Sequence, residues 1–80
     1  MIHITKDTTY SADEVLKRAS DFFGSAGFGL KEKERNSCCL TFEGGGGYVS
    51  VTIAEAGGKR DVDVESREWE YQVKKFLETI

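Results

Sequence analysis

The sequence predicts an α+β domain in which two helices pack on one face of a five-stranded antiparallel sheet. Two segments repeat apolar residues at the helical spacing of 3.6, four short segments alternate apolar and polar residues, and Leu30 to Arg35 is a charged strand. The elements follow in the order β-α-β-β-β-β-α. The 80 residues contain no proline and no linker, so we expect one domain over residues 1–80. The strands should lie in the order 2-3-4-5-1.

The chain opens with a short strand and the first amphipathic helix. Residues Met1 to Lys6 alternate apolar and polar side chains, as in a half-buried strand. Ser11 followed by Glu14 forms a capping box, which predicts that the helix starts just after Ser11. Apolar residues then recur at helical spacing up to Ala26. Two glycines could end the helix in the left-handed conformation, Gly24 and Gly27.

Four further strands follow, separated by short turns. Such spacing is typical of an antiparallel meander, and one apolar face per strand predicts a sheet covered on one side only. The expected strands are Leu30–Arg35, Cys38–Glu43, Tyr48–Ile53 and Asp61–Glu65. The expected turns are Asn36-Ser37, the glycine run Gly44–Gly47, and Gly57-Gly58.

The second helix should begin near Ser66, which we expect to be its N-cap. Its apolar stripe must be buried against the apolar face of the sheet. The stripe comprises Trp69, Val73, Phe76, Leu77 and Ile80. The strand residues that should contact the two helices are Leu40, Phe42, Val49, Val51, Ile53, Val62 and Val64.

The order of elements resembles two known arrangements, although no sequence motif accompanies the likeness. The whole chain is similar to a repeat of the TATA-box-binding protein and to a trimmed helix-grip domain, which implies a fold and no function. From Ser11 onward the order also resembles a double-stranded-RNA-binding domain. That family opens its second helix with a basic cluster, whereas this chain has Arg67-Glu68-Trp69-Glu70 and an extra strand. The sequence therefore argues against RNA binding of that kind.

Composition excludes several classes of function. The net charge of −3 and the pI of 5.1 argue against a nucleic-acid-binding protein. No apolar run approaches the ~20 residues of a membrane span, and the first residues do not resemble a signal peptide. The adjacent Cys38 and Cys39 are expected to be two thiols in a reducing cytoplasm, with Cys38 toward the core. We expect no cofactor and no metal.

Three features of the sequence are candidate sites of chemistry. The run Gly44–Gly47 joins two strands without a following helix, so a mobile hairpin tip is favoured over a phosphate loop. His3 could lie beside Asp61 and Asp63, which is too few ligands for a typical zinc site. Cys39 could become reactive if the basic residues of the second strand lay nearby, but no histidine is placed to activate it.

The preferred function is a non-enzymatic binding or protein-interaction module that works through the uncovered face of the sheet. The expected partner is another protein chain, and the protein itself should be a monomer or a weak dimer. The centre of the site would be Tyr48, Ser50, Thr52, Thr41 and Cys39. The same face should also carry His3, Lys31, Lys33, Arg35, Asp61, Asp63 and Glu65. The alternative is a small-ligand domain or enzyme with a pocket between helices and sheet, lined by Phe22, Phe23, Phe28 and Trp69.

Overall fold

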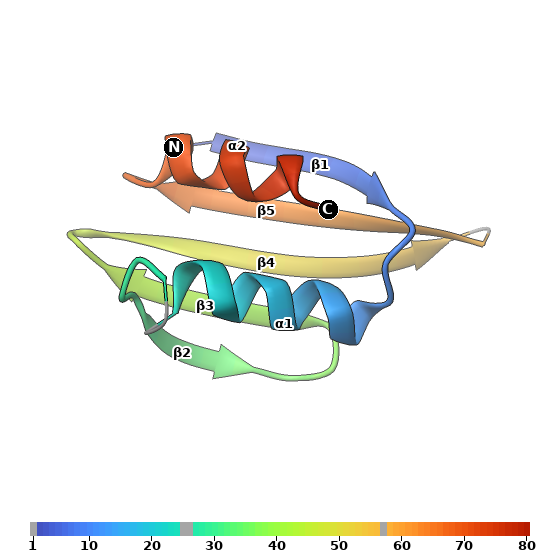
Figure 1. The fold of residues 1–80 in the computed structure, drawn as a ribbon, viewed down its shortest axis with the longest axis horizontal. Helices are drawn as coiled ribbons and strands as arrows, with labels where there is room; N and C mark the ends of the chain where they lie inside the picture. Colours follow the sequence, from blue (N-terminus) through green and yellow to red (C-terminus); the bar gives the residue numbers. More distant parts are fainter. Residues whose placement is uncertain (1, 25–26, 57) are drawn as a thin grey trace.

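A computed structural model of the chain describes residues 2–24, 27–56 and 58–80, and it confirms the predicted order of elements (Figure 1). The elements are β1 (Ile2–Thr8), α1 (Ala12–Phe23), β2 (Lys31–Arg35), β3 (Cys39–Gly44), β4 (Gly47–Ala56), β5 (Lys59–Arg67) and α2 (Glu70–Glu78). The predictions made for Met1, Ala26 and Gly57 fall outside the described residues. Within the described ranges, no helix is both long enough and apolar enough to cross a lipid bilayer.

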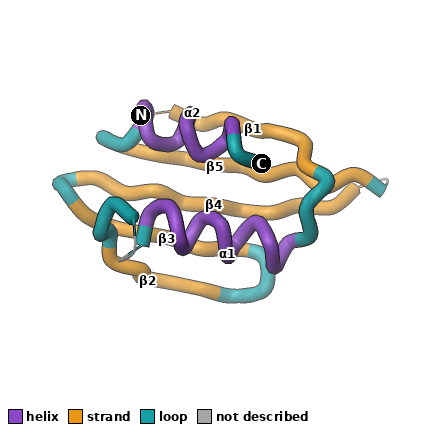
Figure 2. The backbone as a smooth tube through the Cα atoms, in the orientation of Figure 1, coloured by secondary structure: helices purple, strands orange, loops and turns teal. Residues whose placement is uncertain are grey.

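The five strands form one antiparallel sheet in the order β1-β5-β4-β3-β2, as predicted. Both helices lie on the same side of this sheet, with α1 over β3 and β4 and α2 over β5 (Figures 1 and 2). This arrangement satisfies two needs at once, because each helix buries its apolar stripe and the sheet buries one of its two faces.

The core lies between the helices and the sheet, where the sequence places it. Every predicted strand residue of the core is buried, and so are Leu16, Phe23, Val73 and Phe76 from the helices. Aromatic rings link the layers, because Phe23 lies 5.7 Å from Phe42 of the sheet and 5.4 Å from Phe76 of α2 between ring centroids. Trp69 is only half-buried and packs against the edge of this cluster.

Helix α1 begins as predicted and ends differently. The Ser11 hydroxyl accepts a hydrogen bond from the backbone N–H of Glu14 at 3.2 Å, which satisfies one of the donors of the first turn. The helix ends at Phe23, and Gly24 has a φ of −74°, so the predicted left-handed stop is wrong. The first described glycine with positive φ after the helix is Gly29. Gly24 serves close packing instead, since a Cβ there would lie 2.4 Å from the Ser20 carbonyl oxygen.

Helix α2 does not begin at Ser66. Strand β5 continues through Ser66, which pairs with Ile2 of β1 and Val49 of β4 and is fully buried. The helix starts at Glu70 with Trp69 in the N-cap position and without a side-chain cap. Ladder pairing on both sides thus outweighs the capping preference of a serine, which is only a local signal.

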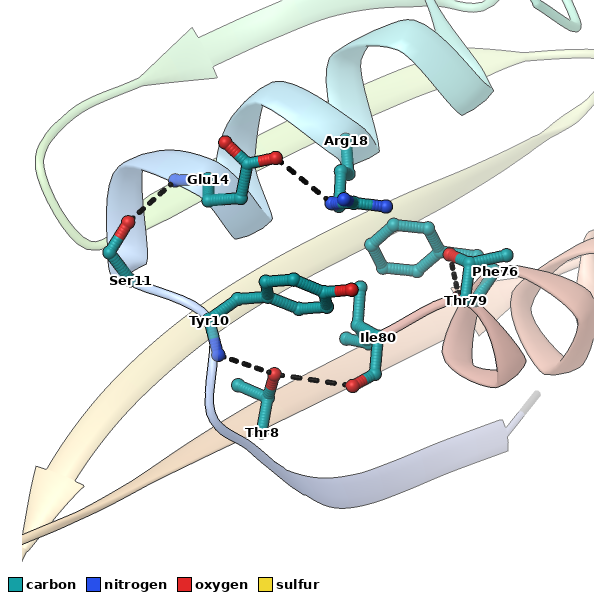
Figure 3. A network of polar contacts seen from close by, with 8 residues as sticks. All are labelled: Thr8, Tyr10, Ser11, Glu14, Arg18, Phe76, Thr79 and Ile80. Carbon is teal, nitrogen blue, oxygen red and sulfur yellow. Dashed lines mark hydrogen bonds and ion pairs between the residues drawn. The ribbon is translucent and has the colours of Figure 1, made fainter.

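A network of polar contacts joins the start of α1 to the end of α2 (Figure 3). The Thr8 hydroxyl accepts a hydrogen bond from the Tyr10 N–H at 3.1 Å and donates one to the Ile80 carbonyl at 3.3 Å. The Arg18 guanidinium lies 4.3 Å above the Tyr10 ring and bonds Glu14 at 3.1 Å. Strand β1 runs to Thr8, two residues beyond the predicted Lys6, because Asp7 and Thr8 pair with Asp61 and Arg60 of β5.

Candidate functional site

The face of the sheet opposite the helices, which we call the open face, carries alternate residues of all five strands. The strand register defines its members, since residues directly opposite each other point to the same face. From the centre of the sheet they are Cys39, Thr41 and Glu43 of β3 and Tyr48, Ser50, Thr52 and Ala54 of β4. The flanks add Lys31 and Glu34 of β2, Lys59, Asp61, Asp63, Glu65 and Arg67 of β5, and His3, Thr5 and Asp7 of β1.

The structure brings the five predicted site residues together at the centre of the open face. Thr41 lies opposite Ser50, and Cys39 lies opposite Thr52, on the neighbouring strands β3 and β4. Tyr48 precedes Ser50 by two residues in β4 and lies next to the glycine turn. Thr52 is exposed and the other four are half-buried, so none of the five is closed off from solvent. They form one patch of hydroxyls and an aromatic ring.

The Tyr48 side chain is held down on the open face. Its hydroxyl lies 3.1 Å from Glu65 Oε2 and donates a hydrogen bond to it. Desolvation of the phenol and then this hydrogen bond raise the pKa of Tyr48 above its usual value, so the hydroxyl keeps its proton and remains a donor at neutral pH. Tyr48 therefore presents a ring of fixed orientation at one end of the patch.

The second strand does not present the predicted basic stripe. A β-bulge between Glu32 and Glu34 shifts the register, so that Lys31 and Glu34 share the open face with β3. Arg35 lies opposite the buried Leu40 and thus on the helix side, where it pairs with Glu32 at 3.7 Å. The expectation that Lys31, Lys33 and Arg35 line one face is wrong, because one extra residue reverses the alternation beyond it.

The opposite end of the open face is acidic. Asp7 and Asp61 lie directly opposite each other on β1 and β5. The hydrogen bond between the two carboxyl groups is the main cause of a raised pKa at Asp61, and partial burial and the charges of Asp7 and Asp63 add to it. The predicted strand ended at Lys6 and therefore left Asp7 out of the open face. Lys6, Asp7 and Thr8 are all polar, so no apolar–polar alternation signals that the strand continues.

The predicted contact between His3 and the acidic strand is confirmed for Asp63. Nε2 of His3 lies 3.3 Å from Oδ1 of Asp63, and the Thr5 hydroxyl donates a hydrogen bond to the same carboxylate. In the register, His3 lies opposite Glu65. In the described part of the chain, no group of three or more potential ligands is placed to hold a metal ion.

The open face concentrates negative charge. It carries six carboxylates against three cations, a formal charge of −3 with His3 neutral. The whole protein has the same net charge of −3, so the eight carboxylates and eight cations of the remaining residues balance. The carboxylates of the open face are Asp7, Glu34, Glu43, Asp61, Asp63 and Glu65, and its cations are Lys31, Lys59 and Arg67.

The glycine run forms a tight hairpin that is fastened to α2. Gly44 pairs with Gly47, and the two residues between them have positive φ values of 60° and 81°. The Trp69 indole N–H donates a hydrogen bond to the Gly44 carbonyl at 2.9 Å. A Cβ at Gly45 would lie 2.9 Å from Cζ2 of Trp69, so only glycine fits under the indole. This contact gives the glycine run a packing role that the prediction of a mobile tip did not contain.

The two cysteines form a disulfide and are not the two thiols that we predicted. Cys38 lies in the bend before β3 and is exposed, whereas the prediction turned it toward the core. Cys39 starts β3 and lies on the open face, as predicted. If both cysteines lay in the strand, their side chains would point to opposite faces. Strand β3 begins at Cys39, one residue later than predicted, so Cys38 lies outside the strand.

The four aromatic residues of the predicted pocket pack against one another. The Phe22 ring lies 5.0 Å from Phe23 and 5.3 Å from Phe28, and Phe28 lies 6.0 Å from Trp69, between ring centroids. Shallow pockets lie at the periphery. One of about 390 Å³ lies at the β1–β5 end of the sheet, and one of about 310 Å³ is lined by Arg18, Asp21, Phe22 and Thr79. Of the four residues of the predicted pocket, only Phe22 lines either of these two pockets.

No family model matches the sequence, and no curated protein matches it either. The fold and the open face therefore carry the functional argument by themselves.

Proposed function

We propose that the protein is a non-catalytic interaction module whose open face binds a basic segment of another protein chain. The observation that carries this proposal is the charge of the open face, six carboxylates against three cations, while the charges of the remaining residues balance. A cytoplasmic location and a monomeric or weakly dimeric state belong to the same proposal.

The five residues at the centre of the open face would add hydrogen bonds and an aromatic contact to the attraction between charges. Thr41, Ser50 and Thr52 offer hydroxyls that both donate and accept hydrogen bonds. Tyr48 offers a large ring of fixed orientation, the type of residue that often anchors a protein interface. The surrounding carboxylates would speed association and select partners of opposite charge, more than they would add affinity.

Binding of this kind should depend on salt. Exposed charges are screened over about 8 Å at physiological ionic strength, so affinity should fall as salt is added. The test is fluorescence anisotropy of a labelled arginine-rich peptide, with a glutamate-rich peptide of equal length as the negative control. The arginine-rich peptide should bind, and the glutamate-rich peptide should not.

Two matched variants distinguish binding at the open face from non-specific attraction of a basic peptide to the negatively charged protein. The triple variant Asp61→Asn, Asp63→Asn, Glu65→Gln removes three charges from the open face. The control Asp13→Asn, Asp21→Asn, Glu78→Gln removes three exposed charges from the helices. The first should weaken binding about tenfold, or about 0.5 kcal/mol for each charge. Equal weakening by both variants, or no binding by the parent protein, would contradict the proposal.

A further inference from the structure

We infer that the Cys38–Cys39 pair is a reversible redox-modification site that exchanges with small thiols and disulfides of the glutathione type. This inference does not depend on the proposed partner of the open face. Its starting point is the location of the disulfide, which joins two adjacent residues at the surface of the turn between β2 and β3.

The disulfide is accessible from solvent. Cys38 is exposed and Cys39 is half-buried. A thiolate from solution can therefore reach the sulfur atom of Cys38, which is the first requirement for thiol–disulfide exchange. Exposed disulfides are more readily reduced than buried structural ones, which accords with a role as a reversible site.

The backbone around the pair has one form that suits the disulfide and a second that suits the thiols. Neighbouring residues of an extended strand point to opposite faces, so Cys38 and Cys39 cannot be bonded while both are extended. In the structure, Cys38 accordingly lies in a bend and β3 starts at Cys39. Reduction removes this restriction and allows β3 to begin one residue earlier.

The strand register assigns a reduced Cys38 to the helix side of the sheet. The register that pairs Cys39 with Thr52 would put Cys38 opposite Ile53, and the Ile53 N–H already donates to the Cys38 carbonyl at 2.8 Å. Ile53 has the highest exposure among the buried apolar residues, at 8%. A Cys38 side chain turned toward the core would cover it, as the alternation of the sequence predicts.

The exchange balances in two steps. A small thiolate forms a bond to the Cys38 sulfur, the Cys38–Cys39 bond breaks, and Cys39 leaves as a thiolate that takes up a proton. A second small thiolate then attacks the small molecule's sulfur in the mixed disulfide, which forms the small disulfide and releases Cys38 as a thiolate that is also protonated. The protein disulfide gains two electrons, and two small thiols become one small disulfide. Oxidation by the small disulfide is the reverse.

The test equilibrates the protein with defined ratios of reduced and oxidised glutathione. The reaction is quenched with acid, thiols are alkylated, and intact mass gives the fractions of disulfide, dithiol and glutathione adduct. Isoleucine methyl spectra are recorded at both ends of the titration. Cys38→Ser and Cys39→Ser are the matched variants, because neither can close the ring.

We expect one two-electron transition without a stable adduct, a shifted Ile53 methyl signal and an unchanged Ile4 signal. The single-cysteine variants should instead accumulate the mixed disulfide. The inference would be overturned by a pair that stays oxidised in excess reduced glutathione, or by one that stays reduced in excess oxidised glutathione. An Ile53 signal that does not differ between the two states would refute the proposed movement of Cys38.

Discussion

Ser66 has a buried side-chain hydroxyl that lacks a hydrogen bond within the described part of the chain. Its side chain is fully buried, and its hydroxyl has no hydrogen-bond partner among the described residues. An unsatisfied buried hydroxyl costs about 1–3 kcal/mol relative to its hydrated state. The position lies on the helix side of β5, between Ile2 and Val49, where an apolar side chain fits the surroundings.

We therefore expect Ser66→Ala to raise the free energy of unfolding by about 1 kcal/mol. Urea denaturation measures it, and Ser50→Ala on the open face is the control, with an expected change within about 0.5 kcal/mol. A lower stability of Ser66→Ala would show that the hydroxyl has a partner that stabilises the fold.

Asp61 links stability to pH. Its pKa is raised in the folded protein, first through the hydrogen bond with Asp7, from an ordinary value of 3.8. The folded state therefore holds this proton more tightly than the unfolded state. The stabilisation is complete below the ordinary pKa and is lost as the pH rises through the raised pKa, after which the two carboxylates repel each other.

Asp61→Asn should thus be more stable than the parent protein at pH 7, and this gain should shrink as the pH falls through the raised pKa of Asp61 toward the ordinary value of 3.8. Thermal melts from pH 3 to pH 8 measure the gain, with Asp21→Asn on α1 as the control for loss of one exposed charge. A gain that is independent of pH would mean that Asp7 and Asp61 do not interact.

Among the secondary-structure elements, the hairpin between β3 and β4 offers two glycines whose variants test the packing of Trp69. Gly45 and Gly46 both have positive φ, so a Cβ at either position costs about 1–2 kcal/mol in backbone energy. Only Gly45 lies under the indole, since a Cβ at Gly46 would meet nothing within 4 Å. The two positions are therefore matched in backbone and differ in contact.

We expect Gly45→Ala to destabilise the protein more than Gly46→Ala, by about a further 1 kcal/mol. Denaturation of both variants measures the difference, and a double-mutant cycle with Trp69→Leu assigns it to the indole. The difference should vanish in the Trp69→Leu background. If it persists there, Trp69 is not the neighbour that excludes a side chain at Gly45.

The boundaries of several elements could not be predicted from the sequence, and the reasons are local. The alternation of β2 ends at a bulge, which no residue type in Lys31–Arg35 signals, and the bulge moves Arg35 to the helix side. Ser66 is a good N-cap by residue type, but its pairing with two strands keeps it in β5. Cys38 precedes β3 because of its bond to Cys39, which the alternation cannot show.

At the scale of the whole molecule, the sequence was sufficient to predict the architecture. The stripes of both helices and the apolar faces of the strands are complementary, and short turns leave an antiparallel sheet as the simplest pairing. The five residues of the central patch also followed from alternation alone. The pair of Asp7 and Asp61 did not, because the register between β1 and β5 depends on contacts far apart in the sequence.

The central claim is that the open face is the working surface of the protein. The most direct measurement maps amide chemical shifts while the arginine-rich peptide is titrated into the labelled protein. The account predicts changes at Tyr48, Ser50, Thr52, Asp61 and Asp63, with little change at Phe22, Phe28 and Val73 on the helix side. Changes confined to the helix side would contradict the account and would favour a site between the two helices.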